Sequence, residues 1–596
     1  MTVRSPLSSP LHPDSLSVSL VSLQYGSQMA MYRHIKTGAL VMSCVSDDEN
    51  KCFGVTFRTP PADSKGIPHI LEHSVLCGSR KYPIKEPFNE LMKGSVNTFL
   101  NAMTFPDRTA YPVASCNLAD FYNLVDVYLD AVLHPKCVDD ELTFKQEGWH
   151  LELNPGEEEM TLKGVVFNEM KGVYSQPDSV FYRTIQAELF PDNTYGVDSG
   201  GDPQVIPDLT FAEFRSFHQR YYHPSNARFW FYGDDAPEKR LELLAAFLDD
   251  FEPRAVDDSK IVPQPLWTQP RQVTRHFPIG LGAAEGADDG ADDGADNKAF
   301  ASVNWVLSEG EIDLETQLAL GFLDYLLTGT SASPLRKTLN DSGLGSALVG
   351  GGLDDDLAQP IYAVGLKGVD PAQAQAVHAL VVSTLERLAE EGFPASAVEA
   401  AINTIEFSLR ENNTGSFPRG LSLMFRAMSS WIYDRNPYES LVWEEPLARF
   451  KARLERESTQ AIFGGLIRKF LLNNNHRVDL TLLPDAGVGA KLERDEADRI
   501  QRAAAAMNED DRRALAAETE HLRTRQETPD DPEALKVRLW GILGLVGSIS
   551  VCCGAALPVR YRLSHLRNAS RRITHAVYSC PVSLGHSAHY YQNSDC

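Results

Sequence analysis

The chain has 596 residues, of which 43% are apolar and 23% are charged, and its formal net charge is 56 − 81 = −25. This composition is typical of soluble globular proteins, and the length is sufficient for about three or four domains with buried cores. The negative charge repels phosphate backbones and membrane surfaces, so nucleic acid is excluded as an expected partner and basic ligands are favoured.

Residues 1–29 are predicted to be an N-terminal extension. The first 30 residues are rich in Ser and Leu and carry one Arg and one Asp, so they make a poor secretory signal and no clear transit peptide. The nine cysteines of the chain are an odd number without regular spacing. Such a set is typical of a reducing compartment rather than of a disulfide framework.

Residues 30–262 are predicted to form a first unit that mixes strands and helices. Residues 53–57 (FGVTF) alternate β-forming side chains. Gly66, Ile67 and Pro68 then lead into an apolar helical segment at 69–76, which Gly78 ends. A strand followed by a helix is typical of a layer in which helices pack on a sheet.

Residues 263–490 are predicted to form a second unit that repeats this order. Residues 361–367 read as a strand, and Asp370 follows as an N-cap for an amphipathic helix that Gly392 ends. Asp313 is the expected N-cap of another helix. We therefore expect two related domains in tandem.

Two polar segments interrupt or follow these units. Residues 283–297 are an acidic insert in which Gly-Ala-Asp occurs three times, and it is interpreted either as a solvated disordered insert or as an acidic docking loop. Residues 491–536 are charged and rich in alanine. They are predicted to form solvent-facing helices that link larger domains.

The composition changes abruptly at residue 537. Residues 537–596 contain six Arg, one Asp, and neither Lys nor Glu, and they hold four of the nine cysteines. Residues 539–559 are uncharged and, at about 1.5 Å per residue, would just span a bilayer. They are rich in Gly, Ser and Cys rather than in Leu and Ile. We therefore expect an unrelated, poorly ordered tail, with a membrane anchor as the weaker alternative.

The segment from His69 to His73 has the pattern H-x-x-E-H. Histidines four positions apart lie one turn apart on one face of a helix, as two ligands of a single Zn²⁺ must. Glu72 is close enough to act on a water molecule at such a centre without binding the metal. The alternative to metal binding is that these side chains cap the helix or form hydrogen bonds at the surface. However, Pro68, Ile70, Leu71 and Val75 make an apolar helix, where unpaired imidazoles and a carboxylate are costly.

A catalytic zinc requires a third protein ligand. The candidate is Glu169, in the segment GVVFNEMKG at 164–172, where a carboxylate again lies within an apolar helical run. The alternative for this segment alone is an ordinary exposed helical glutamate.

The H-x-x-E-H motif and the segments after it resemble the organellar branch of the pitrilysin family, which are inverted-zincin metallopeptidases. The matching segments keep the family's order and spacing: SVLCGS at 74–79, NAMT at 101–104, QEGW at 146–149, the Glu169 segment, SGGDP at 199–203 and YHPSNA at 222–227. The resemblance covers roughly residues 30–536 and fails in the tail. It implies an α+β fold of two tandem homologous domains, each an antiparallel-rich sheet with helices packed on it.

This resemblance also implies residue roles. His69, His73 and Glu169 would ligate one Zn²⁺ per chain, and Glu72 would be the general base. Ala102, Met103 and Thr104 would form an edge strand that pairs with the substrate backbone, since an extended peptide gains backbone hydrogen bonds there whatever its sequence. The implied substrates are short unfolded peptides, mainly basic ones, such as cleaved organelle-targeting presequences. The implied location is the mitochondrial matrix or a plastid.

The sequence departs from the family in one respect. Family members are about twice as long, and their second half supplies an Arg and a Tyr to the active site, for which this chain offers no counterparts. Losing one oxyanion donor typically costs about 10²- to 10³-fold in rate. We therefore expect the chain alone to bind zinc and to cleave peptides weakly or not at all. The alternative to a peptidase is a truncated half-chain that binds zinc and peptide or a partner subunit.

Overall fold

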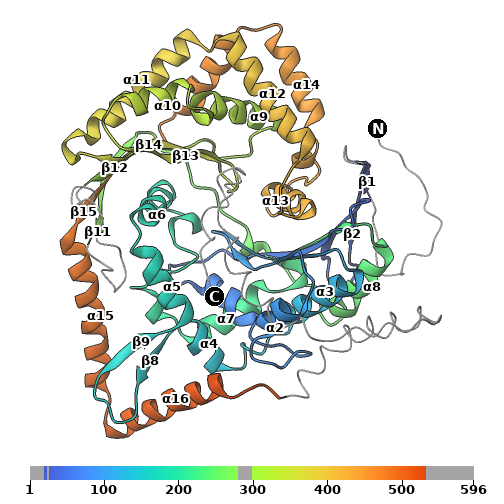
Figure 1. Cartoon of the computed structure of the whole chain (residues 1–596), viewed down its shortest axis with the longest axis vertical. Coiled ribbons are helices and arrows are strands. Elements are labelled where there is room, and N and C mark those ends of the chain that lie inside the picture. The colour runs from blue at the N-terminus through green and yellow to red at the C-terminus, as the bar shows by residue number, and fades with distance from the viewer. Residues whose placement is uncertain (1–18, 23–25, 280–297, 532–596) are drawn as a thin grey trace, which may run out of the picture.

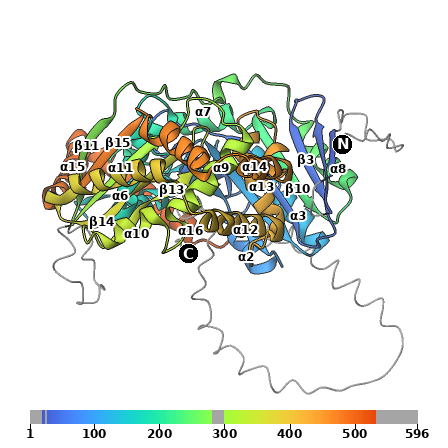
Figure 2. The same cartoon turned by 90° about the horizontal axis from the view of Figure 1, so that it is seen from above.

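The computed structural model describes residues 19–22, 26–279 and 298–531. The described residues form two large sheets, each covered by helices, a two-stranded hairpin and a long helical arm. Strands β11 and β15 of the second sheet lie on the left in both views, and the first sheet lies on the right (Figures 1 and 2). The acidic insert at 283–297 and the tail at 537–596 lie outside the described residues.

The first sheet has eight strands, and its central strands are buried on both faces because helices cover both sides. All neighbouring strands run antiparallel except β3 and β10, which are parallel. Strand β1 lies within the range that was expected to be an extension, and it pairs with β2. The order is β1 (Ser19–Ser22), β2 (Gln28–Arg33), β3 (Leu40–Val45), β10 (Ala227–Gly233), β4 (Lys51–Arg58), β7 (Arg108–Ser115) and β5 (Phe99–Leu100), with β6 (Met103–Thr104) also on β7.

The two faces of this sheet support different layers. One face packs on α1 (Ile67–Val75), α3 (Leu118–Leu133), α7 (Phe211–Tyr221) and α8 (Pro237–Leu248) through one large apolar cluster. The other face packs on α13 (Arg419–Trp431), where Met424 approaches the bare backbone of Gly54. Figure 1 shows α13 on this inner side of the sheet. The helix that carries the H-x-x-E-H motif and α13 therefore lie on opposite faces.

Three further helices and a hairpin of the first unit lie between β4 and β10 in the chain. These are α2 (Pro87–Gly94), α4 (Glu141–Glu147) and α5 (Val165–Tyr174), with the hairpin β8 (His150–Leu153) and β9 (Met160–Lys163) between α4 and α5. Helix α6 (Pro177–Leu189) then packs against the second sheet through an apolar cluster that includes Phe181 and Phe300.

The second sheet repeats the topology of the first. In each sheet the last strand of the unit inserts between two earlier strands, parallel to the first of them in chain order and antiparallel to the other: β10 lies between β3 and β4, and β15 lies between β11 and β12. This match confirms the expected α+β fold with two tandem homologous units. The second sheet runs β11 (Arg271–Pro278), β15 (Arg477–Asp485), β12 (Ala299–Val306), β14 (Ile361–Val369) and β13 (Ala347–Asp354), and its main helices are α9 (Leu314–Asp324), α10 (Pro334–Asp341), α11 (Ala374–Glu391), α12 (Ala395–Glu411) and α14 (Glu444–Leu454).

A helical arm leads from the second sheet back to the first unit. It consists of α15 (Ala486–Ala506) and α16 (Glu509–Glu527), so it begins a few residues before the expected linker at 491–536. Ion pairs such as Arg525–Asp140 and Lys145–Glu518 hold it to the first unit. Within the described ranges, no helix has both the length and the apolar character needed to cross a bilayer.

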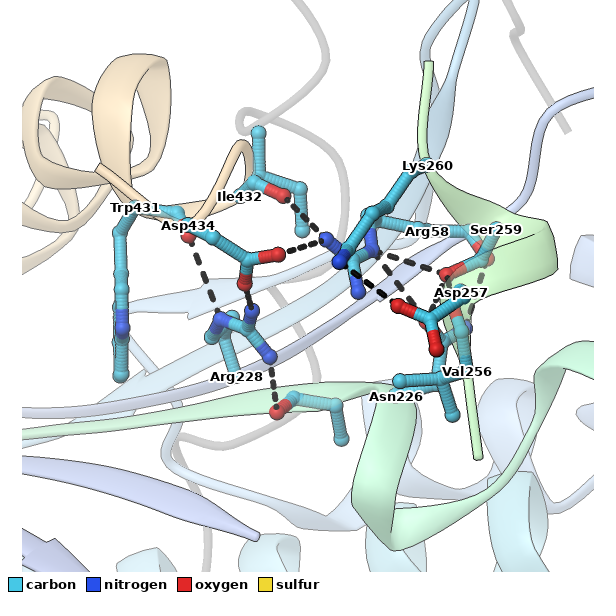
Figure 3. A network of polar contacts seen from close by, with 11 residues as sticks. Arg58, Asn226, Arg228, Val256, Asp257, Ser259, Lys260, Trp431, Ile432 and Asp434 are labelled. Atoms are coloured by element: carbon cyan, nitrogen blue, oxygen red, sulfur yellow. Dashed lines mark hydrogen bonds and ion pairs between the residues drawn. The ribbon is translucent and has the colours of Figure 1, made fainter. Parts of the chain in front are cut away.

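Asp434, just after α13, joins this segment to the first sheet (Figure 3). Its carboxylate bridges Arg58 of β4, at 2.9 Å, and Arg228 of β10. Both guanidinium groups are almost fully buried, and Arg58 also donates to Asn226 and Ser259. One carboxylate therefore compensates two buried positive charges.

Replacing Asp434 by Asn is expected to destabilise the fold. Asn tolerates the left-handed backbone at this position, where φ is 63°, so the change removes mainly the charge. Breaking a fully buried pair costs about 3–5 kcal/mol, and because Asp434 is 44% exposed we expect about 2–3 kcal/mol. Urea unfolding measures the loss. Asp257→Asn, which disrupts only the surface pair with Lys260, is the matched control. An unchanged D434N midpoint would contradict this role.

Candidate active site

The three residues of the H-x-x-E-H motif lie on α1, which packs against the first sheet. Ile70, Leu71 and Val75 are fully buried in the core of the first unit and fix the rotation of the helix. His69 and Glu72 are consequently buried, whereas His73 is partly exposed. The ring centroids of His69 and His73 are 4.9 Å apart, as expected for side chains one turn apart on one face.

Glu169 approaches the histidines from α5. Its neighbours Val166, Phe167 and Met170 are buried, which turns Glu169 toward α1. Glu169 Oε2 lies 3.8 Å from the Nε2 atoms of both His69 and His73. Among the residues that the structure describes, these three form the one group of side chains that could hold a metal ion, with all ligand atoms within 4.8 Å of one another.

These distances fit a tetrahedral zinc. Zinc bonds to nitrogen and oxygen of about 2.0–2.1 Å imply ligand atoms about 3.3–3.5 Å from one another. The observed 3.8 Å is close to this spacing and is longer than a direct charge-assisted hydrogen bond of about 2.7–2.9 Å. Two imidazoles and one carboxylate are also a donor set that catalytic zinc uses, with the fourth position left open.

The Nδ1 atom of each histidine faces an acceptor. His69 Nδ1 lies 3.1 Å from the carbonyl oxygen of Gly200, and His73 Nδ1 lies 3.4 Å from Glu147 Oε2. Both acceptors favour the tautomer with hydrogen on Nδ1, which leaves the Nε2 lone pairs toward Glu169. A Cβ on Gly66 would lie 2.8 Å from the Gly200 oxygen, so glycine at Gly66 permits this approach.

Burial and charge act differently on the two histidines. Burial lowers the pKa of His69 to about 3, which keeps the imidazole neutral and able to bind a metal. Burial also lowers the pKa of His73, but Glu147, Glu72 and Glu169 outweigh it and raise the value to about 9. Burial raises the pKa of Glu169. Without a metal, His73 therefore provides the positive charge among these carboxylates.

Glu72 points toward the edge of the first sheet. The hydroxyl of Thr104, in β6, donates a hydrogen bond of 2.6 Å to Glu72 Oε2. Burial raises the pKa of Glu72, and the charge of His73 and the hydrogen bonds from Thr104 oppose this shift. A buried carboxylate with a raised pKa is suited to accept and return a proton.

The three residues expected to bind substrate lie at this edge. Thr104 is buried, whereas Ala102 and Met103 are partly exposed. Strands β5 and β6 pair with β7 on one side only, so they form the outer edge of the sheet in the described part of the chain. The contact between Thr104 and Glu72 was not expected, because the family resemblance implied only substrate pairing for Thr104.

The roles of Glu147 and Gly200 were also not expected from the sequence. Both lie in segments that carried the family resemblance, QEGW and SGGDP, but neither received a role. The sequence itself shows only a glutamate directly before Gly148. Only the fold shows that its carboxylate is buried and faces His73, where Gln146 Nε2 also donates to it at 2.9 Å.

Three family models match this chain, and all describe M16 peptidases. Insulinase (Peptidase family M16) matches residues 54–183, which include the four site residues on α1 and α5. Peptidase M16 inactive domain matches residues 208–405, and a model of a segment associated with peptidases of this family matches residues 482–537. Residues 208–405 thus match a model described as an inactive domain, and the one metal-binding group in the described ranges lies outside that match.

Similar proteins point to the same family. The chain is 56% identical to presequence protease 1, chloroplastic/mitochondrial, of Arabidopsis thaliana, over 88% of this chain and 49% of that protein. It is 35% identical to the mitochondrial presequence protease of Xenopus tropicalis, over 84% and 48%. The chain therefore spans about half the length of these relatives. A protease structure from Helicobacter pylori has the same fold, with a TM-score of 0.57 and 16% identity over 78% of this chain and all of that one.

Proposed function

The chain belongs to the pitrilysin (M16) family of peptidases, among which it is similar to presequence proteases, and we propose that it is a zinc-dependent endopeptidase. The observation that supports this proposal best is the convergence of His69, His73 and Glu169, with ligand atoms within 4.8 Å of one another, beside a buried carboxylate. One Zn²⁺ per chain would be held by these three residues.

The chemistry follows from the residues around this centre. When bound, Zn²⁺ is a Lewis acid that polarises the scissile carbonyl and makes water acidic enough to lose a proton near neutral pH. Glu72 accepts the proton of the attacking water and returns it to the leaving amine. The hydroxyl of Thr104 orients the Glu72 carboxylate, and the edge residues Ala102 and Met103 present backbone groups to an extended peptide.

The proposed substrates are short, unfolded and basic peptides. Pairing through backbone hydrogen bonds demands an extended chain rather than a particular sequence, and the net charge of −25 attracts basic segments. Cleaved presequences meet both conditions, so we propose them as substrates and the mitochondrial matrix or a plastid as the location. Residues 30–262 are the proposed catalytic domain, and residues 263–490 the proposed second domain.

A second candidate function is binding without efficient cleavage. The chain spans about half the length of its curated relatives, which favours a half-chain that binds zinc and peptide, or a partner subunit. Purified protein incubated with a basic peptide of about 20–50 residues distinguishes the two. Cleavage that a chelator abolishes and zinc restores supports the peptidase. Bound zinc and bound peptide without products would support the second candidate.

Glu147 is expected to strengthen zinc binding through His73. Glu147→Gln keeps the shape of the side chain but removes the charge that makes the imidazole a better ligand. Such partners of metal-binding histidines typically contribute about 10- to 100-fold to metal affinity. Competition with a chromophoric chelator measures zinc affinity without any need for turnover.

The matched control for this prediction is Glu141→Gln. Glu141 lies on the same helix, α4, but is exposed and pairs only with Lys145. Zinc affinity is expected to stay unchanged in this control. Wild-type affinity in Glu147→Gln would show that the charge of Glu147 does not strengthen His73 as a ligand.

A further inference from the structure

The loop that begins at Asp198 packs against the start of α1. The backbone amide of Asp198 donates to the Ser64 hydroxyl at 3.1 Å, and the amide of Asp202 donates to the Ser64 carbonyl oxygen at 2.8 Å. A Cβ on Gly201 would lie 2.9 Å from the Cα atom of Gly66, so the two backbones meet directly. Because Ser64 and Gly66 directly precede α1, this loop fixes the position of the motif helix.

The carboxylate of Asp198 shapes the part of the loop that faces His69. Asp198 Oδ1 accepts a hydrogen bond of 2.9 Å from the backbone amide of Gly200. The carbonyl oxygen of Gly200 lies 3.1 Å from His69 Nδ1. Gly200 is thus held by the carboxylate on its amide side and faces the imidazole with its carbonyl group. Asp198 therefore helps to set the orientation of the His69 ring.

The same carboxylate holds α5, the helix that carries Glu169. Tyr174 is the last residue of α5, and its hydroxyl donates to Asp198 Oδ2 at 2.8 Å. Arg183 of α6 pairs with the same oxygen, and its guanidinium lies 5.2 Å from the centroid of the Tyr174 ring. Burial and the charge of Asp198 raise the pKa of Tyr174, so the hydroxyl stays protonated and donates. The end of α5 is therefore tied to the loop.

Tyr174, Arg183 and Asp198 form a connected group of side chains, which we term the Asp198 cluster. The side chains of Arg183 and Asp198 are only 15% and 12% exposed. Hydrogen bonds to a charged group are roughly twice as strong as neutral ones, and they gain strength where water is scarce. The cluster therefore maintains the separation between Glu169 and His69 before any metal binds, and ligands held in advance bind a metal more tightly.

We propose that Asp198 is a positioning residue for two of the three metal ligands, His69 and Glu169. It acts on His69 through the backbone of Gly200, and on Glu169 through Tyr174 at the end of the same helix. This inference rests on the proposed zinc site and extends it to a residue that lies one contact away from the ligands. A single carboxylate thus adjusts the two helices that must converge on the metal.

The test is the zinc affinity of Asp198→Asn, measured by competition with a chromophoric chelator. Asn keeps the size of the side chain and can still accept from the Gly200 amide, but it cannot neutralise Arg183 and has one oxygen instead of two. We expect about 10-fold weaker zinc binding, at the lower end of the effects typical for residues that support metal ligands.

Tyr174→Phe is the second variant, because it removes one hydrogen bond and keeps the ring. We expect about 3-fold weaker zinc binding, which corresponds to the loss of one ordinary hydrogen bond. The double variant should lose less affinity than the product of the two single effects, since both changes act through one contact. Should Asp198→Asn fail to fold, Tyr174→Phe carries the test, and parental zinc affinity in that variant would overturn the role of Asp198.

Asp434→Asn is the matched control, because it also removes an aspartate that pairs with a buried arginine. Its carboxylate contacts Arg58 and Arg228 in the network of Figure 3 instead of the loop and α5. This variant should be less stable, yet bind zinc with parental affinity under conditions in which it is folded. A loss of zinc affinity as large as that of Asp198→Asn would overturn the proposal, because it would reveal a general effect of stability.

Cobalt substitution reports the geometry of the site without any need for turnover. Co²⁺ can replace Zn²⁺ among nitrogen and oxygen ligands, and its visible absorption depends on the coordination geometry. Asp198→Asn should alter the spectrum of the cobalt-loaded chain, and Asp434→Asn should not. Parental zinc affinity together with an unchanged cobalt spectrum in Asp198→Asn would overturn the positioning role. Failure of the proposed function would appear separately, as absence of zinc binding by the parent chain.

Discussion

Replacing Glu72 by Gln is expected to lower kcat by about 10²- to 10⁴-fold, the range typical for loss of a general acid–base group. Gln is isosteric and can still accept the hydrogen bond from Thr104, so the site keeps its shape. It cannot take a proton from the attacking water. The measurement is the rate of cleavage of a basic peptide by protein loaded with one equivalent of zinc.

Zinc affinity supplies the control for this prediction. Glu72→Gln should bind zinc about as tightly as the parent chain, because Glu72 is not one of the three converging ligands. Glu147→Gln should behave in the opposite way, with weaker zinc binding and, once loaded, a smaller loss of rate. Cleavage by Glu72→Gln at the parental rate would remove Glu72 from the mechanism.

Replacing Glu169 by Ala is expected to weaken zinc binding by about 10²- to 10³-fold. Four-ligand structural zinc sites have apparent binding free energies of about 10–16 kcal/mol, or roughly 2.5–4 kcal/mol for each ligand. At about 1.4 kcal/mol for each factor of ten, one ligand is worth roughly two to three orders of magnitude. Isothermal titration with zinc at a fixed pH measures the change.

Asn168→Ala is the matched control for Glu169→Ala. Asn168 precedes Glu169 on α5 but is exposed and does not belong to the metal-binding group. Its removal should not alter zinc affinity. Should Glu169→Ala bind zinc as tightly as the control, the third ligand would have to come from another residue, and the peptidase proposal would lose its main support.

Local elements of this fold were predictable because their signals lie within a few residues. Gly66 and Pro68 mark the start of α1, and Gly392 follows the end of α11. Asp370 accepts a hydrogen bond from the backbone of Ala372, although the first turn after it is a 3₁₀ turn. Caps and glycine stops act through nearby backbone groups, so the sequence alone reveals them.

Features that depend on contacts between distant segments were not predictable from local pattern. The apolar helical run at 164–172 made Glu169 a candidate ligand, and the family resemblance assigned it to the site, but no local signal shows its approach to His69 because the two residues are so far apart in the chain. Glu147 and Gly200 were missed for the same reason, since their roles exist only once α4 and the SGGDP loop meet α1. Pairing of β1 with β2 also lies outside what a Ser-rich segment indicates.

We propose that His69, His73 and Glu169 hold one zinc ion. Zinc K-edge X-ray absorption of the purified chain, together with its metal content, tests this most directly. We expect one zinc per chain, with nitrogen and oxygen neighbours at about 2.0–2.1 Å and the scattering pattern of two imidazoles. Sulfur neighbours at about 2.3 Å, or zinc content that is unchanged when both histidines are replaced by alanine, would contradict it.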